Sequence, residues 1–232
     1  QLRTLITPRT KAVIFVDAFG NPSGIKKIYE ICKSKKITLI EDAACAIGSK
    51  TDGKHCGSFS DLSCVSFHPR KLICTGEGGA ILTDNKEWSK WLNIKLRHGA
   101  SRSEEVGMNF DEFGYNFRLS EIQALLGSLQ LKKLDQIVKH RNKIRDMYVK
   151  QLTNLGFVSQ YVEDGVLFNC QSVVFKLPLG TSRNKLISFL KAKHIESTLG
   201  TYSISSNSYF SRKYHKTCRN SRFLQENTIT LP

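Results

Sequence analysis

The first part of the chain alternates between strand-like and helix-like patterns of apolar residues. Residues 11–20 form a β-rich apolar run, and residues 37–44 form a second one that ends in acidic side chains. Between them, residues 24–36 place apolar side chains on one helical face, which Ser23 is positioned to cap. This order of elements predicts a β-α-β unit with parallel strands and a right-handed crossover.

Two more short strands are predicted at residues 62–67 and 78–84. Strands that are apolar along nearly their whole length and are covered by helices are typical of a central α/β sheet. The fold class expected from the pattern is therefore α/β with a mostly parallel sheet.

The pattern becomes helical from residue 87 and passes through a polar connection at residues 107–117. A long amphipathic helix follows, which Gly156 is expected to end as a C-cap. Beyond it, strand, strand and helix signals predict a small α+β domain. The predicted organisation is a large domain over residues 1–133, a connecting helix over 134–156 and the small domain over 157–232.

Composition narrows the class of protein. Hydrophobic residues make up 40% of the chain, and no apolar run approaches the roughly 18 residues that cross a membrane. The seven cysteines are an odd number, are scattered and include no C-x-x-C pair. This usage favours reduced thiols in a cytoplasmic protein over a disulfide framework, and no metal site is expected.

The formal net charge of +15 leaves three kinds of partner open: nucleic acid, an anionic surface or a phosphate-rich small substrate. From Arg183 to Arg222 the one acidic residue is Glu196. No basic motif interleaved with aromatic residues is visible, which makes a solvated basic surface the simpler interpretation.

Polar side chains follow two of the predicted strands. Asp42 ends one apolar run and Cys45 lies just beyond it, while Ser66 lies near the end of the next run and Lys71 follows that run. Taken singly, they fit a turn acid or helix cap, a core hydroxyl and a solvated lysine. Ligands of open α/β sheets bind at the carboxyl ends of the strands, and a carboxylate, a hydroxyl and an amine at that edge suit pyridoxal phosphate.

Four segments, residues 40–49, 57–85, 96–100 and 114–135, resemble successive signatures of the DegT/DnrJ/EryC1/StrS family of sugar aminotransferases. They occur in the family's order, and the resemblance covers most of residues 8–150. It implies a pyridoxal phosphate-dependent transferase of fold type I, like aspartate aminotransferase. The large domain would then bind the cofactor, and the small domain would be its C-terminal partner.

The resemblance also implies roles for individual residues. Lys71 matches the Schiff-base lysine, Asp42 the carboxylate that pairs with the pyridine nitrogen, and Ser66 a hydroxyl that binds the cofactor phosphate. Asn116 matches an asparagine donated to the cofactor phosphate of the neighbouring subunit, which implies a homodimer with shared active sites. Cys45 stands where many members have a glutamine near the ring hydroxyl, and a thiol is a poorer hydrogen-bond partner.

The chain departs from the family in three places. Asp17 stands where many members have a histidine, and Ser205 and Ser208 stand where a His-x-x-Pro motif is frequent. Members also carry a substantial portion before the segment that begins at residue 5, and the end of this chain falls short of the usual terminus. We therefore expect both large and small domains to be partial.

The expected function is amino-group transfer, with L-glutamate as the expected donor, to a nucleotide-linked keto-deoxysugar in amino-sugar or polysaccharide biosynthesis. Retention of Lys71 argues against the branch of relatives that perform dehydration. The alternative is a truncated, catalytically inactive relative that acts as a binding or dimerisation module. A nucleic-acid-binding protein is a third hypothesis, and it rests on net charge alone.

Overall fold

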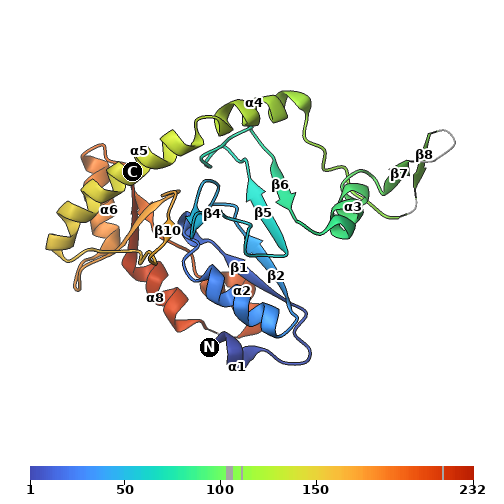
Figure 1. The fold of residues 1–232 in the computed structure, drawn as a ribbon. Helices are drawn as coiled ribbons and strands as arrows, with labels where there is room; N and C mark the ends of the chain where they lie inside the picture. The colour runs from blue at the N-terminus through green and yellow to red at the C-terminus, as the bar shows by residue number, and fades with distance from the viewer. Residues whose placement is uncertain (103–106, 111, 216) are drawn as a thin grey trace. The chain divides into compact units, whose positions relative to one another are not determined.

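The computed structural model describes every residue except 103–106, 111 and 216 (Figure 1). The α-helices are α1 (Leu2–Leu5), α2 (Ile25–Ser34), α3 (Lys86–Lys95), α4 (Glu121–Leu131), α5 (Leu134–Leu152), α6 (Arg183–Ala192), α7 (Ser208–Tyr214) and α8 (Arg219–Asn227). The strands are β1 (Ala12–Val16), β2 (Thr38–Asp42), β3 (Lys50–Thr51), β4 (Lys54–His55), β5 (Leu62–Ser66), β6 (Gly79–Leu82), β7 (Ala100–Arg102), β8 (Met108–Phe110), β9 (Val158–Ser159), β10 (Val166–Leu167), β11 (Val173–Lys176), β12 (Thr198–Leu199) and β13 (Thr228–Leu231). Among the helices described, none is long and apolar enough to cross a membrane.

The chain divides into two compact units, and the first comprises Gln1–Ile137 with Glu163–Asn169. Its central sheet has the strand order β1-β2-β5-β6. The first three strands are parallel and β6 is antiparallel to β5. The predicted α/β class with a mostly parallel sheet is confirmed.

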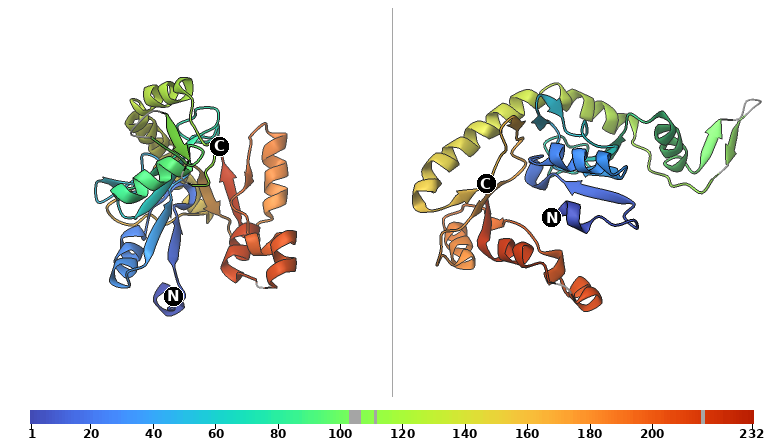
Figure 2. Two further views of the ribbon diagram at one scale, coloured as in Figure 1. Left: turned by 90° about the vertical axis from the view of Figure 1, so that its right-hand side faces the viewer. Right: turned by 60° about the horizontal axis from the view of Figure 1, so that its bottom comes forward.

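Helix α2 covers one face of this sheet (Figures 1 and 2). Ile25 and Cys32 of α2 and Leu39 of β2 are buried together, with Phe15 of β1 packed against them. Burying one such side chain fully contributes about 1.5–3 kcal/mol, so this packing stabilises the contact between α2 and the sheet. The helix was predicted from the same apolar stripe.

The opposite face of the sheet is more open. Ile14 and Val16 alternate with the half-buried Val13 and Phe15 of β1 and are 67% and 55% exposed. Val16 is the register partner of Asp42, and Asp42 is the register partner of Cys64 on β5. Neighbours in register point to the same face, so the Asp42 side chain lies on the face opposite α2.

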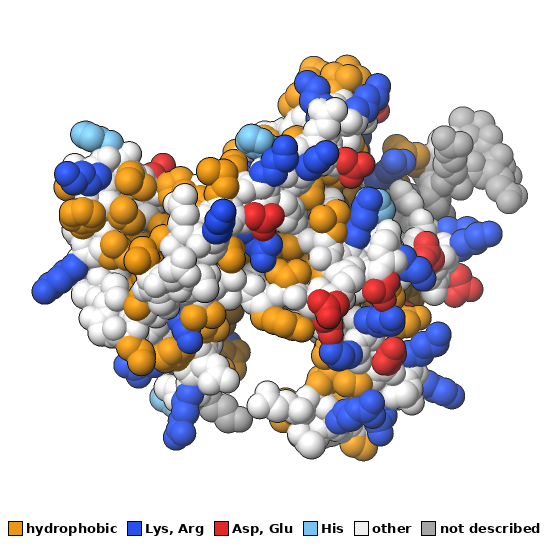
Figure 3. Space-filling view, turned by 60° about the vertical axis from the view of Figure 1, so that its left-hand side comes forward, with side chains coloured by type: hydrophobic (Ala, Val, Ile, Leu, Met, Phe, Trp, Pro, Cys, Tyr) orange, Lys and Arg blue, Asp and Glu red, His pale blue; other side chains and the backbone are white. Residues whose placement is uncertain are grey.

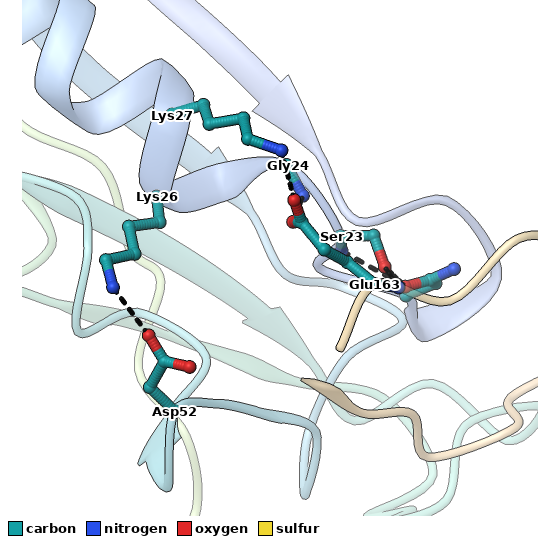
Figure 4. A network of polar contacts seen from close by, with 7 residues as sticks. Ser23, Gly24, Lys26, Lys27, Asp52 and Glu163 are labelled. Carbon is teal, nitrogen blue, oxygen red and sulfur yellow. Dashed lines mark hydrogen bonds and ion pairs between the residues drawn. The ribbon is translucent and has the colours of Figure 1, made fainter. Parts of the chain in front are cut away.

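The N-terminus of α2 corrects a prediction from the sequence (Figure 4). The capping position is Gly24, which has a φ of +93°, and its N–H donates to Glu163 Oε2 at 3.0 Å. Lys27 pairs with the same carboxylate. The expected Ser23 cap is wrong because the Ser23 hydroxyl donates to Asn21 and accepts from the Glu163 backbone N–H.

The segment after α3 also differs from expectation. β8 lies within the predicted polar connection and pairs antiparallel with β7, which precedes the connection. Residue 111 of the connection and the nearby residues 103–106 lie outside the described residues. Helix α4 then begins with a capping box, in which Ser120 and Gln123 bond to each other's backbone N–H groups.

The second unit comprises Val138–Val162 and Cys170–Pro232. Its sheet has the order β12-β13-β11-β9, with antiparallel neighbours. Phe175 and Ile229 form its buried core, against which α6 packs through Leu186 and Leu190. The domain boundaries expected after residues 133 and 156 stay a prediction.

Candidate active site

Asp42 and Ser66 lie at the carboxyl ends of two neighbouring strands. β2 and β5 are parallel, and Asp42 is level with Cys64, two residues before Ser66. Because side chains two residues apart on a strand share a face, the carboxylate and the hydroxyl lie on the same open face. Both residues are half-buried. The strand order therefore positions the acid and the hydroxyl that the sequence singled out.

Lys71 lies in the connection between β5 and β6 and points to the segment that follows β2. Its Nζ is 2.9 Å from the Sγ of Cys45, and its backbone N–H donates to the His68 carbonyl at 2.9 Å. Both side chains are half-buried. The structure thus brings together two of the predicted residues that are separated by 26 positions.

Asn116 has no described contact with Lys71 or Cys45. It is exposed, and its Oδ1 accepts a hydrogen bond from Arg118 Nε at 3.1 Å. It lines a cavity of about 490 Å³, together with Cys64 of β5, Gly79 of β6 and Gln123 of α4. Its described hydrogen bond leaves the Nδ2 group available as a donor.

The glycines that follow Lys71 allow the chain to turn back into the sheet. A Cβ on Gly79 would lie 2.6 Å from the Val65 carbonyl oxygen of β5. Gly78 has a φ of +147°, a conformation that other residues rarely adopt. The backbone hydrogen bond from Phe67 to the Gly78 carbonyl, at 2.9 Å, closes the connection. The loop that carries Lys71 is therefore a tight, specified structure.

Two glutamines of α4 hold the same loop, and sequence reasoning missed them both. Gln123 Nε2 donates to the carbonyls of Thr75 and Glu77 at 3.2 and 2.9 Å. Gln130 accepts from the Cys74 N–H at 3.0 Å and donates to the Cys74 carbonyl at 2.5 Å. A side-chain amide matches a backbone amide in this way. The capping-box pattern signals Gln123 at the helix start but not this second role.

A buried asparagine holds the segment that carries Cys45, and it was missed as well. Asn169 is fully buried, and its Nδ2 donates to the carbonyls of Cys45 and Ile47 at 2.8 and 2.9 Å. Its backbone N–H donates to Ser49 Oγ at 3.0 Å. The buried carbonyls of this turn thereby gain partners from a residue more than 120 positions away.

Asp17 follows β1 and is fully buried. No N–H or hydroxyl donor among the described residues reaches its carboxyl oxygens. Burial raises its pKa to about 9, and the charge of Glu41, a side-chain hydrogen bond with Glu41 and the charge of Asp42 add to the effect. The neighbouring Glu41 carboxylate, in contrast, has donors within reach: it accepts hydrogen bonds from the Gly57 N–H and the Ser60 hydroxyl. Asp17 is therefore neutral at pH 7.

The carboxyl ends of β2 and β5 thus offer a carboxylate and a hydroxyl, and the segments that follow these strands bring together an amine and a thiol. Such a set can bind a polar ring with an attached anion, and its amine can act as a nucleophile. Among the described residues, no three His, Cys, Asp or Glu side chains are grouped so as to hold a metal ion. All seven cysteines are free thiols.

Comparison with known proteins gives consistent matches. The sequence profile of the DegT/DnrJ/EryC1/StrS aminotransferase family matches residues 1–232. GDP-perosamine synthase of Escherichia coli O157:H7 is 34% identical over 212 residues, which cover 91% of this chain and 57% of that protein. The structure of Helicobacter pylori PseC, an aminotransferase of pseudoaminic acid biosynthesis, superimposes with a TM-score of 0.93 at 25% identity and covers 100% of this chain and 63% of that one.

A third comparison concerns the cofactor. A putative sugar aminotransferase of Streptococcus pneumoniae, solved in its pyridoxal phosphate form, has the same fold, with a TM-score of 0.89 at 24% identity. This chain covers 65% of that chain, so it spans about three fifths of the length of these relatives.

Proposed function

Because the chain belongs to the DegT/DnrJ/EryC1/StrS aminotransferase family, whose members depend on pyridoxal phosphate, we propose that it acts in amino-sugar biosynthesis. The reaction is the transfer of an amino group from an amino acid to a nucleotide-linked keto-deoxysugar. The relatives named above support a nucleotide-sugar substrate, and L-glutamate is the donor that we propose. The observation that carries the proposal is the contact between Lys71 and Cys45 beside the Asp42 edge of the sheet.

The residues present fit pyridoxal phosphate. When bound, this cofactor serves as an electron sink for amine transfer. A carboxylate such as Asp42 keeps a ring nitrogen protonated by its negative charge. Ser66 offers a hydroxyl donor at the end of β5, where its Oγ already accepts from the His68 N–H at 3.3 Å. Lys71 would supply the amine that holds the cofactor, and its Nζ would move the proton that the transfer requires.

Cys45 is the residue whose role departs from the family. A thiol is a weak hydrogen-bond donor and acceptor compared with a side-chain amide. We propose that Cys45 lines the cofactor ring and orients the Lys71 amine through the 2.9 Å contact, without replacing the amide's hydrogen bond to the ring hydroxyl.

We propose a homodimer in which Asn116 reaches the cofactor phosphate of the partner. The residues between β8 and the end of α4 support this because they expose an unusual amount of apolar surface. The residues concerned are 45–81% exposed and are Met108, Phe110, Phe113, Tyr115, Phe117, Ile122, Leu125, Leu126, Leu129 and Leu131. Apolar surface of this extent is typical of protein interfaces.

A second candidate function is a catalytically inactive module for binding or dimerisation. It is favoured by the serines, Ser205 and Ser208, that stand where the His-x-x-Pro motif is frequent. Ser205 has a local role, since its Oγ accepts from the Cys218 N–H at 3.1 Å and lies 3.0 Å from Ser203 Oγ. We place either form of the protein in the cytoplasm, in keeping with its free thiols.

The test uses the full-length protein, pyridoxal phosphate, glutamate and keto-sugars linked to GDP, UDP and dTDP. The wild type is expected to show the long-wavelength absorbance of covalently attached cofactor, which Lys71→Ala abolishes. Amine transfer should fall by roughly 10²–10⁴-fold in this variant. Lys90→Ala on α3, an exposed site, is the matched control and should change neither readout. An unchanged spectrum in Lys71→Ala would refute the role of Lys71, and absence of amine transfer to every keto-sugar tested would favour the inactive module.

A further inference from the structure

The contact between Lys71 and Cys45 brings together two side chains that can react with each other. An amine nitrogen and a sulfur only 2.9 Å apart need a small displacement to reach bonding distance. The backbone on each side is fixed, because Asn169 holds the Cys45 carbonyl and the His68 carbonyl holds the Lys71 N–H. The two reactive atoms are therefore held near each other by the fold and do not depend on a chance encounter.

Cys45 differs from most other cysteines of the chain. Burial raises the pKa of Cys56 to about 12 and that of Cys170 to about 11. It also raises the pKa of Cys32 and Cys64. Because the thiolate is the form that reacts with oxidants, the raised pKa disfavours oxidation of these four thiols, of which Cys64 is nevertheless exposed. Cys45 is half-buried and has a lysine amine at hydrogen-bond distance, an environment typical of reactive cysteines.

We propose that Cys45 and Lys71 are a modification site, at which a peroxide oxidant drives formation of a covalent sulfur–nitrogen cross-link. The observation that carries this proposal is the 2.9 Å separation of Nζ and Sγ. The product is a sulfenamide, the class of compound that a sulfenic acid forms when it condenses with a nitrogen.

The reaction balances in two steps. The Cys45 thiolate attacks hydrogen peroxide, so a sulfur–oxygen bond forms and the oxygen–oxygen bond breaks. The hydroxide that leaves takes up the proton given up by the thiol and becomes water. Sulfur is oxidised and peroxide is reduced. The neutral Lys71 amine then attacks sulfur, the sulfur–oxygen bond breaks and hydroxide takes a proton from nitrogen as a second water. Two equivalents of an external thiol reverse the bond, returning amine and thiol and forming a disulfide of the reductant.

The cross-link would withdraw the Lys71 nitrogen from any other chemistry. This consequence rests on the proposed function, in which the same nitrogen attaches the cofactor. Cofactor already attached to Lys71 should then protect the pair, and cross-linked protein should bind no cofactor covalently. The cross-link itself requires only the two side chains and peroxide, so the two proposals can fail separately.

The experiment treats the full-length, cofactor-free protein with graded hydrogen peroxide, blocks free thiols and digests with trypsin. The expected product joins residues 37–50 to residues 71–86, two hydrogen atoms lighter than the separate peptides and uncleaved after Lys71. A disulfide from Cys45 to Cys74 would have the same mass deficit, but trypsin would still cut after Lys71. The Cys74→Ser background removes this disulfide altogether.

The product should disappear in Cys45→Ser and in Lys71→Arg, persist in the control Cys218→Ser and be lost on treatment with dithiothreitol. Cys45 recovered as sulfinic or sulfonic acid, with Lys71 cleaved normally, would overturn the proposal. So would oxidation of Cys218 at peroxide concentrations that leave Cys45 untouched. If protein preloaded with pyridoxal phosphate cross-links as readily as cofactor-free protein, the shared use of Lys71 is refuted while the cross-link stands.

Discussion

Asp17 shows how one buried carboxyl makes stability depend on pH. Its ordinary pKa is 3.8, and burial raises it to about 9 in the folded chain. Between these values the folded state binds more protons than the unfolded state, so stability is greatest below pH 3.8 with respect to this group. It falls as pH rises through the window, by up to about 1.4 kcal/mol per pH unit.

Asp17→Asn should therefore stabilise the protein at pH 7 and above and should flatten the decline between pH 5 and 9. The amide keeps the shape of the neutral carboxyl but has no proton to lose. Urea unfolding at pH 5, 7 and 8.5 measures the effect, with the exposed Asp164→Asn as control. A variant whose stability declines with pH as steeply as the wild type would show that Asp17 is ionised in the folded chain.

For single residues, the sequence predicts where the candidate site residues lie better than it predicts which other side chains hold them in place. Asp42, Ser66 and Lys71 were expected at one sheet edge because each follows an apolar run, and strand polarity makes those ends meet. Their chemical roles remain predictions. Gln123 and Asn169 were missed because their partners lie 46 to 124 residues away, and no local pattern marks an amide that will bond to a distant carbonyl.

Among the elements, α4 acts on the loop of Lys71 through side chains as well as packing. Gln130→Ala would leave the N–H and the carbonyl of Cys74 without their amide partner, at a cost of about 1–3 kcal/mol. We expect faster amide hydrogen exchange over residues 72–78 and weaker cofactor binding, with little change in the central sheet.

Hydrogen exchange followed by mass spectrometry measures the exchange rate over residues 72–78, and Gln151→Ala in the last turn of α5 is the control. Uniformly faster exchange in all of β1, β2 and β5 would show a general loss of stability. Unchanged exchange over residues 72–78 would show that packing alone holds the loop.

Helices and strands were predicted correctly where the pattern of apolar residues within one segment is enough to define the element. The run before Gly20 became β1, and the apolar stripe of α2 was correct in place and face. The expected Ser23 cap failed because Glu163, from a remote segment, supplies the acceptor instead. The pairing of β7 with β8 was missed because the strands have three residues each and every residue of β8 is exposed.

For the whole molecule, the formal net charge is +15, and on the face drawn in Figure 3 this charge is not gathered into one basic patch. Figure 3 shows Lys and Arg side chains scattered over the visible face, with hydrophobic and some acidic side chains between them. A scattered charge fits the solvated basic surface inferred from the sequence better than a nucleic-acid interface, which groups its cations along a stripe or cleft. The apolar residues of α4 are the stronger indication of a partner.

The proposed dimer makes a prediction that a single chain cannot satisfy. If each site combines Lys71 of one subunit with Asn116 of the other, Lys71→Ala and Asn116→Ala are each expected to lose most activity as pure dimers. A mixed dimer keeps one site with both residues intact. Because half of randomly reassembled dimers are mixed and one of their two sites works, mixing equal amounts should restore about a quarter of wild-type activity.

The measurement is amine transfer before and after the two full-length variants are unfolded together and refolded. Lys71→Ala mixed with a Lys71→Ala, Asn116→Ala double variant is the matched control, because no pairing of these chains builds a complete site. Ile122→Asp, which places a charge on a side chain that is 81% exposed in the single chain, should shift sedimentation towards monomer and abolish the recovery. Leu179→Asp, fully exposed in the second unit, should not. Recovery absent from the mixed sample, with dimers intact, would place Asn116 in the site of its own chain.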